Sequence, residues 1–359
     1  MKKICLILFL AIFGIVSCTE KEIVRTQENH ETNVIKFSSY NGAVKGNPVD
    51  NNNEFMSSGN SFGVTAFIST SDNPYMGSGS VGSKITSNGT LWNYANSGDL
   101  RYWPTNNETL DFYAYAPYED VNMSNLTFSK TNGIQFSYTV PQAEANQVDL
   151  MFASNIGVVK PTGSNKVTLQ FKHALTQVLF KAATKVTGLQ VDIAQNGITI
   201  NNIKNSGTFS IPTTGNGWVL DNSTTSYTIT NSEITGIDYV GDAGNEFTQI
   251  GDNNNVLMLL PQTFSAATPP STTECYLSIS CKIYQVIGED RVYLFGSDTS
   301  YDTLTIGISS KNGTNEVWNR SKRVTYNILF GGGSDSAPIE FETEVEEWTN
   351  VEGGTISIS

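Results

Sequence analysis

The amino-acid sequence predicts an all-β protein in which two β-sandwich domains follow one another. Short runs rich in β-branched and aromatic residues recur along the chain, and turns rich in Gly, Asn and Ser separate them. Charged residues make up only 15% of the 359 residues, a balance that suits uncharged polar strand faces better than helix surfaces. The length allows two domains of ordinary size.

The N-terminus has the pattern of a lipoprotein signal peptide over residues 1–17. Met1-Lys2-Lys3 is followed by the uncharged run Ile4–Val16 and then by Ser17-Cys18. A basic start, a short apolar run and a small residue before the cut are typical of secretory signals. The run is shorter than the roughly 20 residues that span a bilayer. Cys18 is therefore the predicted lipidation site, and cleavage beside an incidental cysteine is the alternative.

Residues 18–32 are predicted to be a flexible tether. The segment begins Cys18-Thr19-Glu20-Lys21-Glu22 and stays polar as far as Thr32. Such a composition cannot bury enough apolar surface to fold on its own.

The first sandwich is expected over residues 33–160 and the second over residues 161–359, on either side of the turn-rich stretch Lys160–Asn165. In the first, the strand-like runs are Val34–Tyr40, Phe62–Ile68, Thr109–Pro117, Ile134–Pro141 and Leu150–Ala153. In the second they are Val167–Phe171, Val178–Ala182, Leu189–Ile193, Ile198–Ile203, Thr208–Ile211, Val256–Leu260, Tyr276–Val286, Arg291–Phe295, Leu304–Ile308, Val324–Phe330 and Ile339–Val345. Many short strands at this spacing indicate sandwiches.

The segment Phe171–Phe180 has two interpretations. Its apolar residues follow helical spacing, which by itself favours a helix of about three turns. The strand-rich surroundings favour a strand or a bent pair of strands, and the strand is our prediction.

Composition and motifs argue against catalysis, cofactors and metals. A formal charge of −13 has the wrong sign for nucleic acid or anionic lipid surfaces. His30 and His173 have no ligand-type residue at metal-binding spacing, and His173 is expected to be a hydrogen-bonded structural residue. Cys275 and Cys281, six residues apart on one expected strand, would lie about 20 Å from each other. They should be buried thiols rather than a disulfide. The chain is therefore predicted not to be an enzyme.

An ordered set of short segments resembles the fimbrillin family of Bacteroidales, lipoprotein precursors of type V pili. The set comprises the lipobox ending at Cys18, Leu110–Pro117, Asp149–Ala153, Leu169–Leu175, Leu259–Gln262, Tyr326–Ile328 and Val345–Trp348. The resemblance implies two transthyretin-like sandwiches and assembly with other pilus subunits by donor-strand exchange. In that process a strand of one subunit completes the sheet of the next. The resemblance also implies that a protease opens the acceptor groove by cutting after a basic residue near the N-terminus.

Two segments are candidates for these steps. Arg25 is the only arginine before Arg101, so it is the predicted cleavage site, and a solvated linker arginine is the alternative. A cut there would also release the lipid anchor. The chain ends in the alternating run Thr355-Ile356-Ser357-Ile358-Ser359 after two glycines. This run is the predicted donor strand, and completion of its own sheet is the alternative.

The predicted function is that of a structural or tip subunit of a cell-surface pilus that serves adhesion. The chain would be lipid-anchored in the outer membrane and then incorporated into a fimbrium. Its sequence leaves open a stalk, anchor or tip role and the adhesion ligand. The alternative is a surface-anchored glycan-binding lipoprotein of a polysaccharide-uptake system. Exposed aromatic residues would favour that alternative, and Trp92, Tyr94, Tyr102 and Trp103 form a cluster in the sequence.

Overall fold

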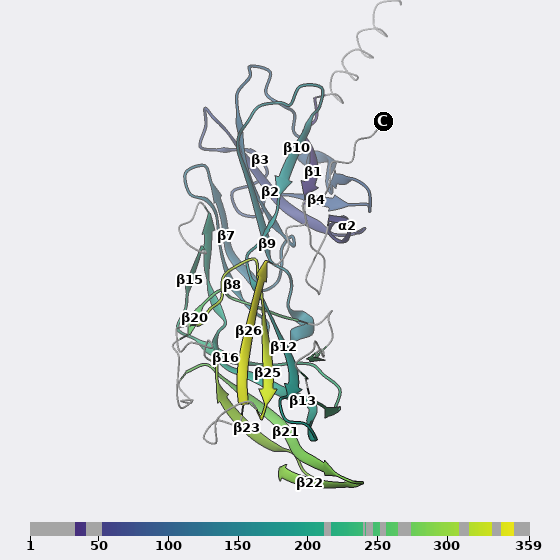
Figure 1. Cartoon of the computed structure of the whole chain (residues 1–359). Helices are drawn as coiled ribbons and strands as arrows, with labels where there is room; N and C mark the ends of the chain where they lie inside the picture. The colour runs from purple at the N-terminus through teal and green to yellow at the C-terminus, as the bar shows by residue number, and fades with distance from the viewer. Residues whose placement is uncertain are drawn as a thin grey trace, which may run out of the picture.

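The computed structural model describes residues 33–40, 52–211, 217–239, 241, 247–251, 256–264, 274–308, 316–331 and 339–347. These residues form an elongated, almost entirely β body (Figure 1), which confirms the all-β prediction. The predicted signal, the tether, Cys18, Arg25 and Thr355–Ser359 lie outside the described residues. No helix among the described residues is long and apolar enough to span a membrane.

One end of the body is built on a nine-stranded sheet with the order β10-β1-β5-β4-β2-β6-β9-β11, to which β3 adds beside β2. Its strands are β1 (Lys36–Tyr40), β2 (Ser61–Ile68), β3 (Pro74–Met76), β4 (Ser83–Ser87), β5 (Trp92–Tyr94), β6 (Leu110–Ala116), β9 (Met151–Val158), β10 (Lys166–Gln170) and β11 (Lys172–His173). The short helices α2 (Asn52–Phe55), η1 (Ser97–Asp99) and η2 (Glu144–Asn146) lie in its connections.

The other end contains a five-stranded sheet and a six-stranded sheet. The five-stranded sheet runs β18-β12-β25-β26, with β19 beside β12. It contains β12 (Thr176–Thr184), β18 (Thr248–Ile250), β19 (Leu257–Leu259), β25 (Lys322–Phe330) and β26 (Ile339–Glu347). The six-stranded sheet is built on β13 (Leu189–Lys204) and β21 (Tyr276–Ile287), flanked by β16 (Thr224–Thr228), β17 (Ile234–Ile237), β22 (Asp290–Phe295) and β23 (Asp302–Gly307). A small ladder joins β20 (Thr263–Phe264) to β24 (Glu316–Val317).

A four-stranded sheet joins the two ends, and we call it the joint sheet. Its order is β15-β14-β8-β7, with β7 (Met123–Ser129), β8 (Gly133–Thr139), β14 (Ser206–Ile211) and β15 (Trp218–Leu220). β14 pairs antiparallel with β8 along its full length, from Ser206 opposite Thr139 to Ile211 opposite Ile134. Two strands from each part of the sequence therefore form one hydrogen-bonded unit.

Two hydrophobic cores match this arrangement. The smaller core lies in the nine-stranded sheet and includes Phe37, Phe62, Trp103 and Phe112. The larger core begins with residues such as Phe67 and Tyr115, passes through the joint sheet at Phe136 and Phe209, and continues to Phe330. It therefore connects the two ends of the molecule without a break.

The ambiguous segment Phe171–Phe180 consists of strands, as predicted. β11 and the start of β12 are separated by a bend at Ala174 and Leu175. Phe171 packs in the smaller core, whereas Ala174, Leu175 and Val178 pack in the larger one. The apolar residues of this segment have helical spacing because the segment crosses from one core to the other and the bend changes which side chains are buried.

The predicted domain division between residues 160 and 161 stays a prediction. The sheets add one relevant fact: β10, on the C-terminal side of that division, pairs with β1 in the nine-stranded sheet. Sheet membership therefore changes near His173 rather than near Pro161.

Candidate functional site

The short strand β1 occupies an interior position in the nine-stranded sheet. It pairs in parallel with β10 over five residue pairs, from Lys36 opposite Lys166 to Tyr40 opposite Gln170. On its other side it pairs antiparallel with β5 at Phe37 and Trp92. Both partners are distant in sequence, so β1 lies between two strands that belong to later parts of the chain.

Two apolar side chains fix β1 to the core. Ile35 and Phe37 are buried, and the Lys36 side chain between them is exposed. This alternation is what a strand with one buried face requires. The Phe37 ring makes edge contacts with Phe62 and Tyr94, both at 5.9 Å between ring centroids.

Backbone hydrogen bonds hold the segment just before β1. The Ile35 amide donates to the Arg101 carbonyl at 2.8 Å, and the Trp103 amide donates to the Asn33 carbonyl at 3.0 Å. The Lys36 amide donates to the Asn165 carbonyl at 2.9 Å, and the Asn165 side-chain amide donates to the Val34 carbonyl at 2.7 Å. Main-chain bonds of this kind can be made by any extended segment, whatever its sequence.

Without β1, this place would be an open groove. Its walls would be the β10 edge and the backbone of residues 101–103, and its floor would be the rings that now contact Phe37. A groove of this form accepts an extended strand that carries apolar side chains two residues apart. We call the place of β1 the β1 groove.

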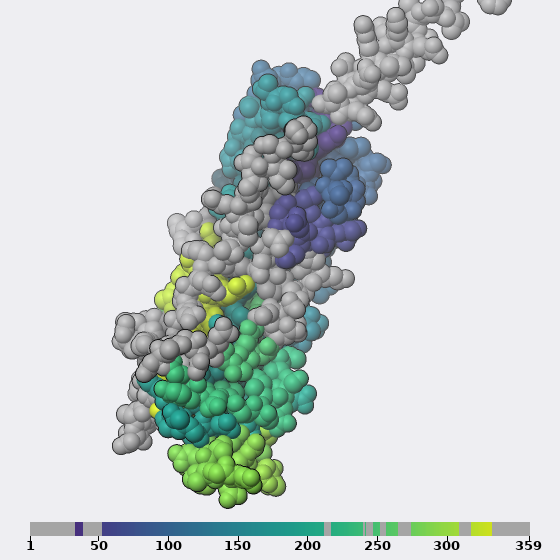
Figure 2. Space-filling view, turned by 45° about the vertical axis from the view of Figure 1, so that its right-hand side comes forward, coloured from purple at the N-terminus to yellow at the C-terminus, as the bar shows by residue number. Residues whose placement is uncertain are grey.

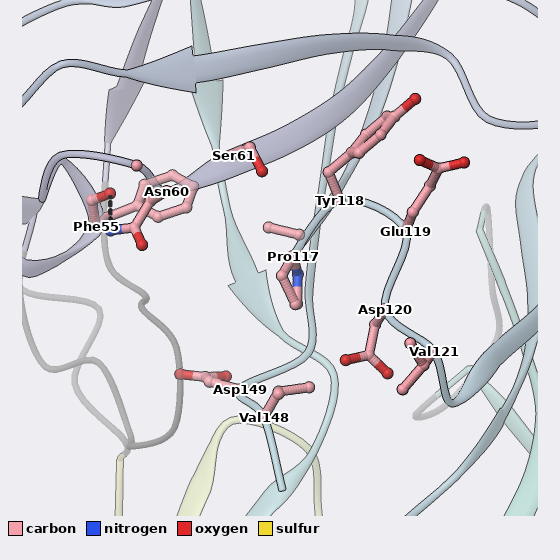
Figure 3. Close-up of a pocket in the computed structure, with 12 residues that line it drawn as sticks. Phe55, Asn60, Ser61, Pro117, Tyr118, Glu119, Asp120, Val121, Val148 and Asp149 are labelled. Atoms are coloured by element: carbon pink, nitrogen blue, oxygen red, sulfur yellow. Dashed lines mark hydrogen bonds between the residues drawn. The ribbon is translucent and has the colours of Figure 1, made fainter. Parts of the chain in front are cut away.

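A separate cavity of about 320 Å³ lies beside the smaller core (Figure 3). Phe55, Ala116 and Pro117 supply apolar lining, and Val148 and Asp149 line it just before β9. Figure 3 shows the Tyr118 ring and the Glu119 carboxylate together on one side, with Asp120 and Asp149 on the other.

The charge of this cavity is acidic. Glu119, Asp120 and Asp149 line it, and none of its described lining residues is basic. Burial raises the pKa of the Tyr118 hydroxyl, and the neighbouring Glu119 carboxylate raises it further. Asp149 already accepts a hydrogen bond from His173. The cavity can attract a cationic group and would repel an anion.

His173 and the two cysteines have the structural roles that were predicted. His173 is buried, and its Nδ1 lies 2.9 Å from Asp149 Oδ1. Cys275 and Cys281 are both buried thiols. Burial, followed by the charge of Asp302, raises the pKa of the Cys281 thiol to about 12, so this thiol stays protonated. Among the described residues, no group of three His, Cys, Asp or Glu side chains could hold a metal ion.

Two of the four aromatic residues that could have formed a sugar-stacking surface are core residues. Trp92 and Trp103 are buried in the smaller core, and the Trp103 indole donates to the Asn165 carbonyl at 3.1 Å. Tyr94 is partly buried, and its hydroxyl donates to the Ile35 carbonyl at 3.1 Å. These three residues support β1 rather than an exposed platform.

Comparison with known proteins agrees with this architecture. The model of the family described as "Fimbrillin-like" matches residues 48–348, which is most of the chain. The chain belongs to the fimbrillin-like family. Fimbrium subunit Fim1C of Phocaeicola vulgatus is 26% identical over 192 residues, a match that covers 48% of this chain and 49% of that protein. The match thus spans about half the length of this curated relative.

Solved structures show the same fold. A fimbrial protein from Bacteroides vulgatus aligns with a TM-score of 0.59 at 18% identity, over 88% of this chain and 100% of that one. A candidate cell adhesion protein from Bacteroides uniformis aligns with a TM-score of 0.50 at 16% identity, over 88% and 99%. At these identities the likeness concerns the fold alone.

The place of β1 in this fimbrillin-like chain is the feature that sequence reasoning missed. The run Val34–Tyr40 predicts a strand, and the alternation of Ile35 and Phe37 predicts its buried face. Nothing in the sequence shows that its partners are β10, about 130 residues away, and β5. A short N-terminal strand followed by a polar segment was the only available signal.

Proposed function

We propose that the chain is a subunit of a cell-surface pilus that assembles by donor-strand exchange, with the β1 groove as the acceptor site. The observation that carries the proposal is the double pairing of β1. β1 and the residue before it lie between two distant strands and are held by two buried side chains and by backbone hydrogen bonds, so another strand that offers the same contacts can replace them. Family membership supports the same role.

The predicted donor strand has the spacing that this groove requires. The buried side chains of Ile35, just before β1, and Phe37, on β1, are two residues apart. In Thr355-Ile356-Ser357-Ile358-Ser359 the two isoleucines have the same separation. We propose that Ile356 and Ile358 of one subunit take the places of Ile35 and Phe37 in the next. The smaller Ile358 would fill part of the space that the Phe37 ring leaves.

The order of residues along the chain separates two cleavage events. A cut after Arg25, the predicted site, lies before β1, so it would release the lipid on Cys18 and leave β1 covalently attached. Separation of β1 requires a cut between β1 and α2, and Lys45 is the only lysine or arginine in residues 41–51. We therefore propose that Arg25 serves release from the outer membrane and that Lys45 serves opening of the groove.

Limited trypsin digestion of protein that begins at Thr19 tests this scheme. The products are sized by native gel electrophoresis, and their N-termini are sequenced. A cut after Lys45 should convert the uncut protein into ladders that persist at about 500 mM NaCl, where contacts between exposed charges are screened, and Lys45→Gln should prevent this. Arg25→Gln should leave the ladders unchanged. With Lys21 and Lys45 already changed to Gln, which removes the other basic residues of residues 19–25 and 41–51, Arg25→Gln should block release of the lipidated form from vesicles.

Deletion of Thr355–Ser359 tests the donor role of a subunit apart from its acceptor role. The deleted chain should not form ladders by itself, but after the cut it should accept a synthetic peptide of residues 355–359 extended by the preceding glycines. A protein that stays a monodisperse monomer after a verified cut following Lys45 would contradict strand exchange.

The glycan-binding alternative has lost the support of Trp92 and Trp103, because both are buried.

A further inference from the structure

Four exposed aliphatic side chains gather on the hairpin of β21 and β22. Val286, Ile287, Val292 and Leu294 have exposed fractions of 41%, 60%, 45% and 60%. Val292 and Leu294 are two residues apart on β22, and Ile287 lies on β21 opposite Asp290. β22 is the edge strand of the six-stranded sheet. Exposed apolar residues grouped in this way mark interaction surfaces.

The turn of this hairpin is acidic. Glu289 and Asp290 are exposed, and neither forms an ion pair with any described residue. The adjacent Arg291 is turned to the sheet, where its Nη1 lies 3.5 Å from the buried Asp192 Oδ2 and its guanidinium covers the Tyr284 ring. We call Ile287, Glu289, Asp290, Val292 and Leu294 the tail patch.

A patch of opposite charge lies around the start of β10. Lys36 and Lys166 are exposed and directly opposite each other in the ladder of β1 and β10. The Lys160 ammonium bonds to the Asn33 side chain, just before β1. None of these three lysines forms an ion pair with a described residue. Like charges directly opposite each other destabilise a ladder, so an acidic partner would relieve their repulsion.

Exposed aliphatic residues accompany these lysines. Ile156 on β9 and Val159 just after it have exposed fractions of 55% and 54%. The Asn155 side chain donates to the Thr168 carbonyl of β10, which fixes this part of β9 beside β10. The Asp111 carboxylate, which accepts from the Gly157 amide, is the nearby acidic group. We call Ile156, Val159, Lys160 and Lys166 the head patch; Lys36 is left out because it would leave with β1 in the proposed exchange.

The two patches lie toward opposite ends of the elongated body. In Figure 1, β1 and β10 lie in the upper part and β22 forms the lower end. The space-filling view agrees, with the light-green segment that contains β22 alone at the bottom (Figure 2). One chain therefore cannot bring its own head and tail patches together.

We infer that the tail patch of one subunit docks on the head patch of a second copy of this chain. Both patches contain exposed aliphatic side chains, and both carry charges of opposite sign that form no ion pair with a described residue. A contact between two different surfaces that lie at opposite ends repeats without closing and gives a line of subunits. The inference rests on the proposed function in that the partner is another pilus subunit, but this contact needs no strand exchange.

Self-association of the uncut protein tests the inference apart from strand exchange. Protein that begins at Thr19 is studied by sedimentation velocity over a concentration series at about 50 mM and 500 mM NaCl, since screening weakens contacts between exposed charges. The head variant is K160E/K166E, and the tail variant is E289K/D290K. The variant K130E/K172E is a control that has the same charge change as the head variant but lies outside both patches. The wild type and the control should associate, less so at the higher salt.

Each patch variant alone should associate about tenfold more weakly than the wild type, because like charges then face each other. An equimolar mixture of the two variants should regain the association of the wild type, because a basic tail then meets an acidic head. A monomeric wild type, a patch variant that associates as the wild type does, or a mixture that does not recover would each overturn the inference. Trypsin ladders of the same proteins report separately on strand exchange.

Discussion

At the scale of single residues, the joint sheet depends on Gly133 at the first position of β8. Its φ of +66° lies in the left-handed region, which costs other residues about 1–2 kcal/mol. A Cβ at this position would also lie 2.0 Å from the Ile211 carbonyl oxygen of β14. The Gly133→Ala substitution must therefore push β8 away from β14 at one end of their ladder.

We predict that Gly133→Ala lowers the free energy of unfolding by about 1–3 kcal/mol more than its backbone strain alone. The matched control is Gly163→Ala, whose φ of +72° is similar but whose Cβ would meet no atom within 4 Å. Urea unfolding followed by tryptophan fluorescence measures both variants. Equal losses of stability would show that β8 and β14 are not in close contact at Gly133.

At the scale of elements, the proposed exchange makes β1 important in the monomer and dispensable in the polymer. We predict that Phe37→Ala lowers the stability of the uncut monomer by about 3–5 kcal/mol, the usual loss for a buried phenylalanine. The same substitution should leave the heat resistance of trypsin-formed ladders unchanged, because Phe37 no longer lies in the groove. Electrophoresis of ladders after heating at graded temperatures measures the second effect.

Phe62→Ala is the control for this prediction. Phe62 contacts Phe37 but lies on β2, which stays in the sheet after exchange. Its removal should weaken the monomer and the ladder alike. If Phe37→Ala also weakens the ladder, β1 remains in its groove and a different strand is exchanged.

Local sequence patterns determine the long strands but not the very short ones. Runs such as Tyr276–Val286 and Val324–Phe330 alternate or stay apolar over a whole strand, so their state follows from the sequence. Very short strands such as β3 and β5 have no such pattern, because neighbouring strands alone hold them in place. The β1 groove was not predictable for a related reason: the pairing of β1 with β10 and β5 depends on how all the intervening strands fold.

At the scale of the whole molecule, the joint sheet and the larger core connect the two ends by paired strands and shared packing. β8 gains its second ladder from β14, and Phe136 on β8 packs against Phe209 on β14 at 5.2 Å between ring centroids. A load applied along a line of subunits would therefore pass through paired strands rather than through a flexible linker. Heat unfolding of the intact chain should accordingly be one cooperative transition.

The last prediction concerns a chain of residues 33–160, which ends at the division that the sequence suggested. This fragment lacks β10, so β1 loses its parallel partner, and it lacks β14, so β8 exposes an edge and the Phe136 ring. We predict that the fragment binds a hydrophobic dye and melts without a cooperative transition, whereas residues 33–359 melt with equal calorimetric and van't Hoff enthalpies. A cooperative melt of the fragment would show that the nine-stranded sheet folds without β10 and without the strands that β14 and β15 add to the joint sheet.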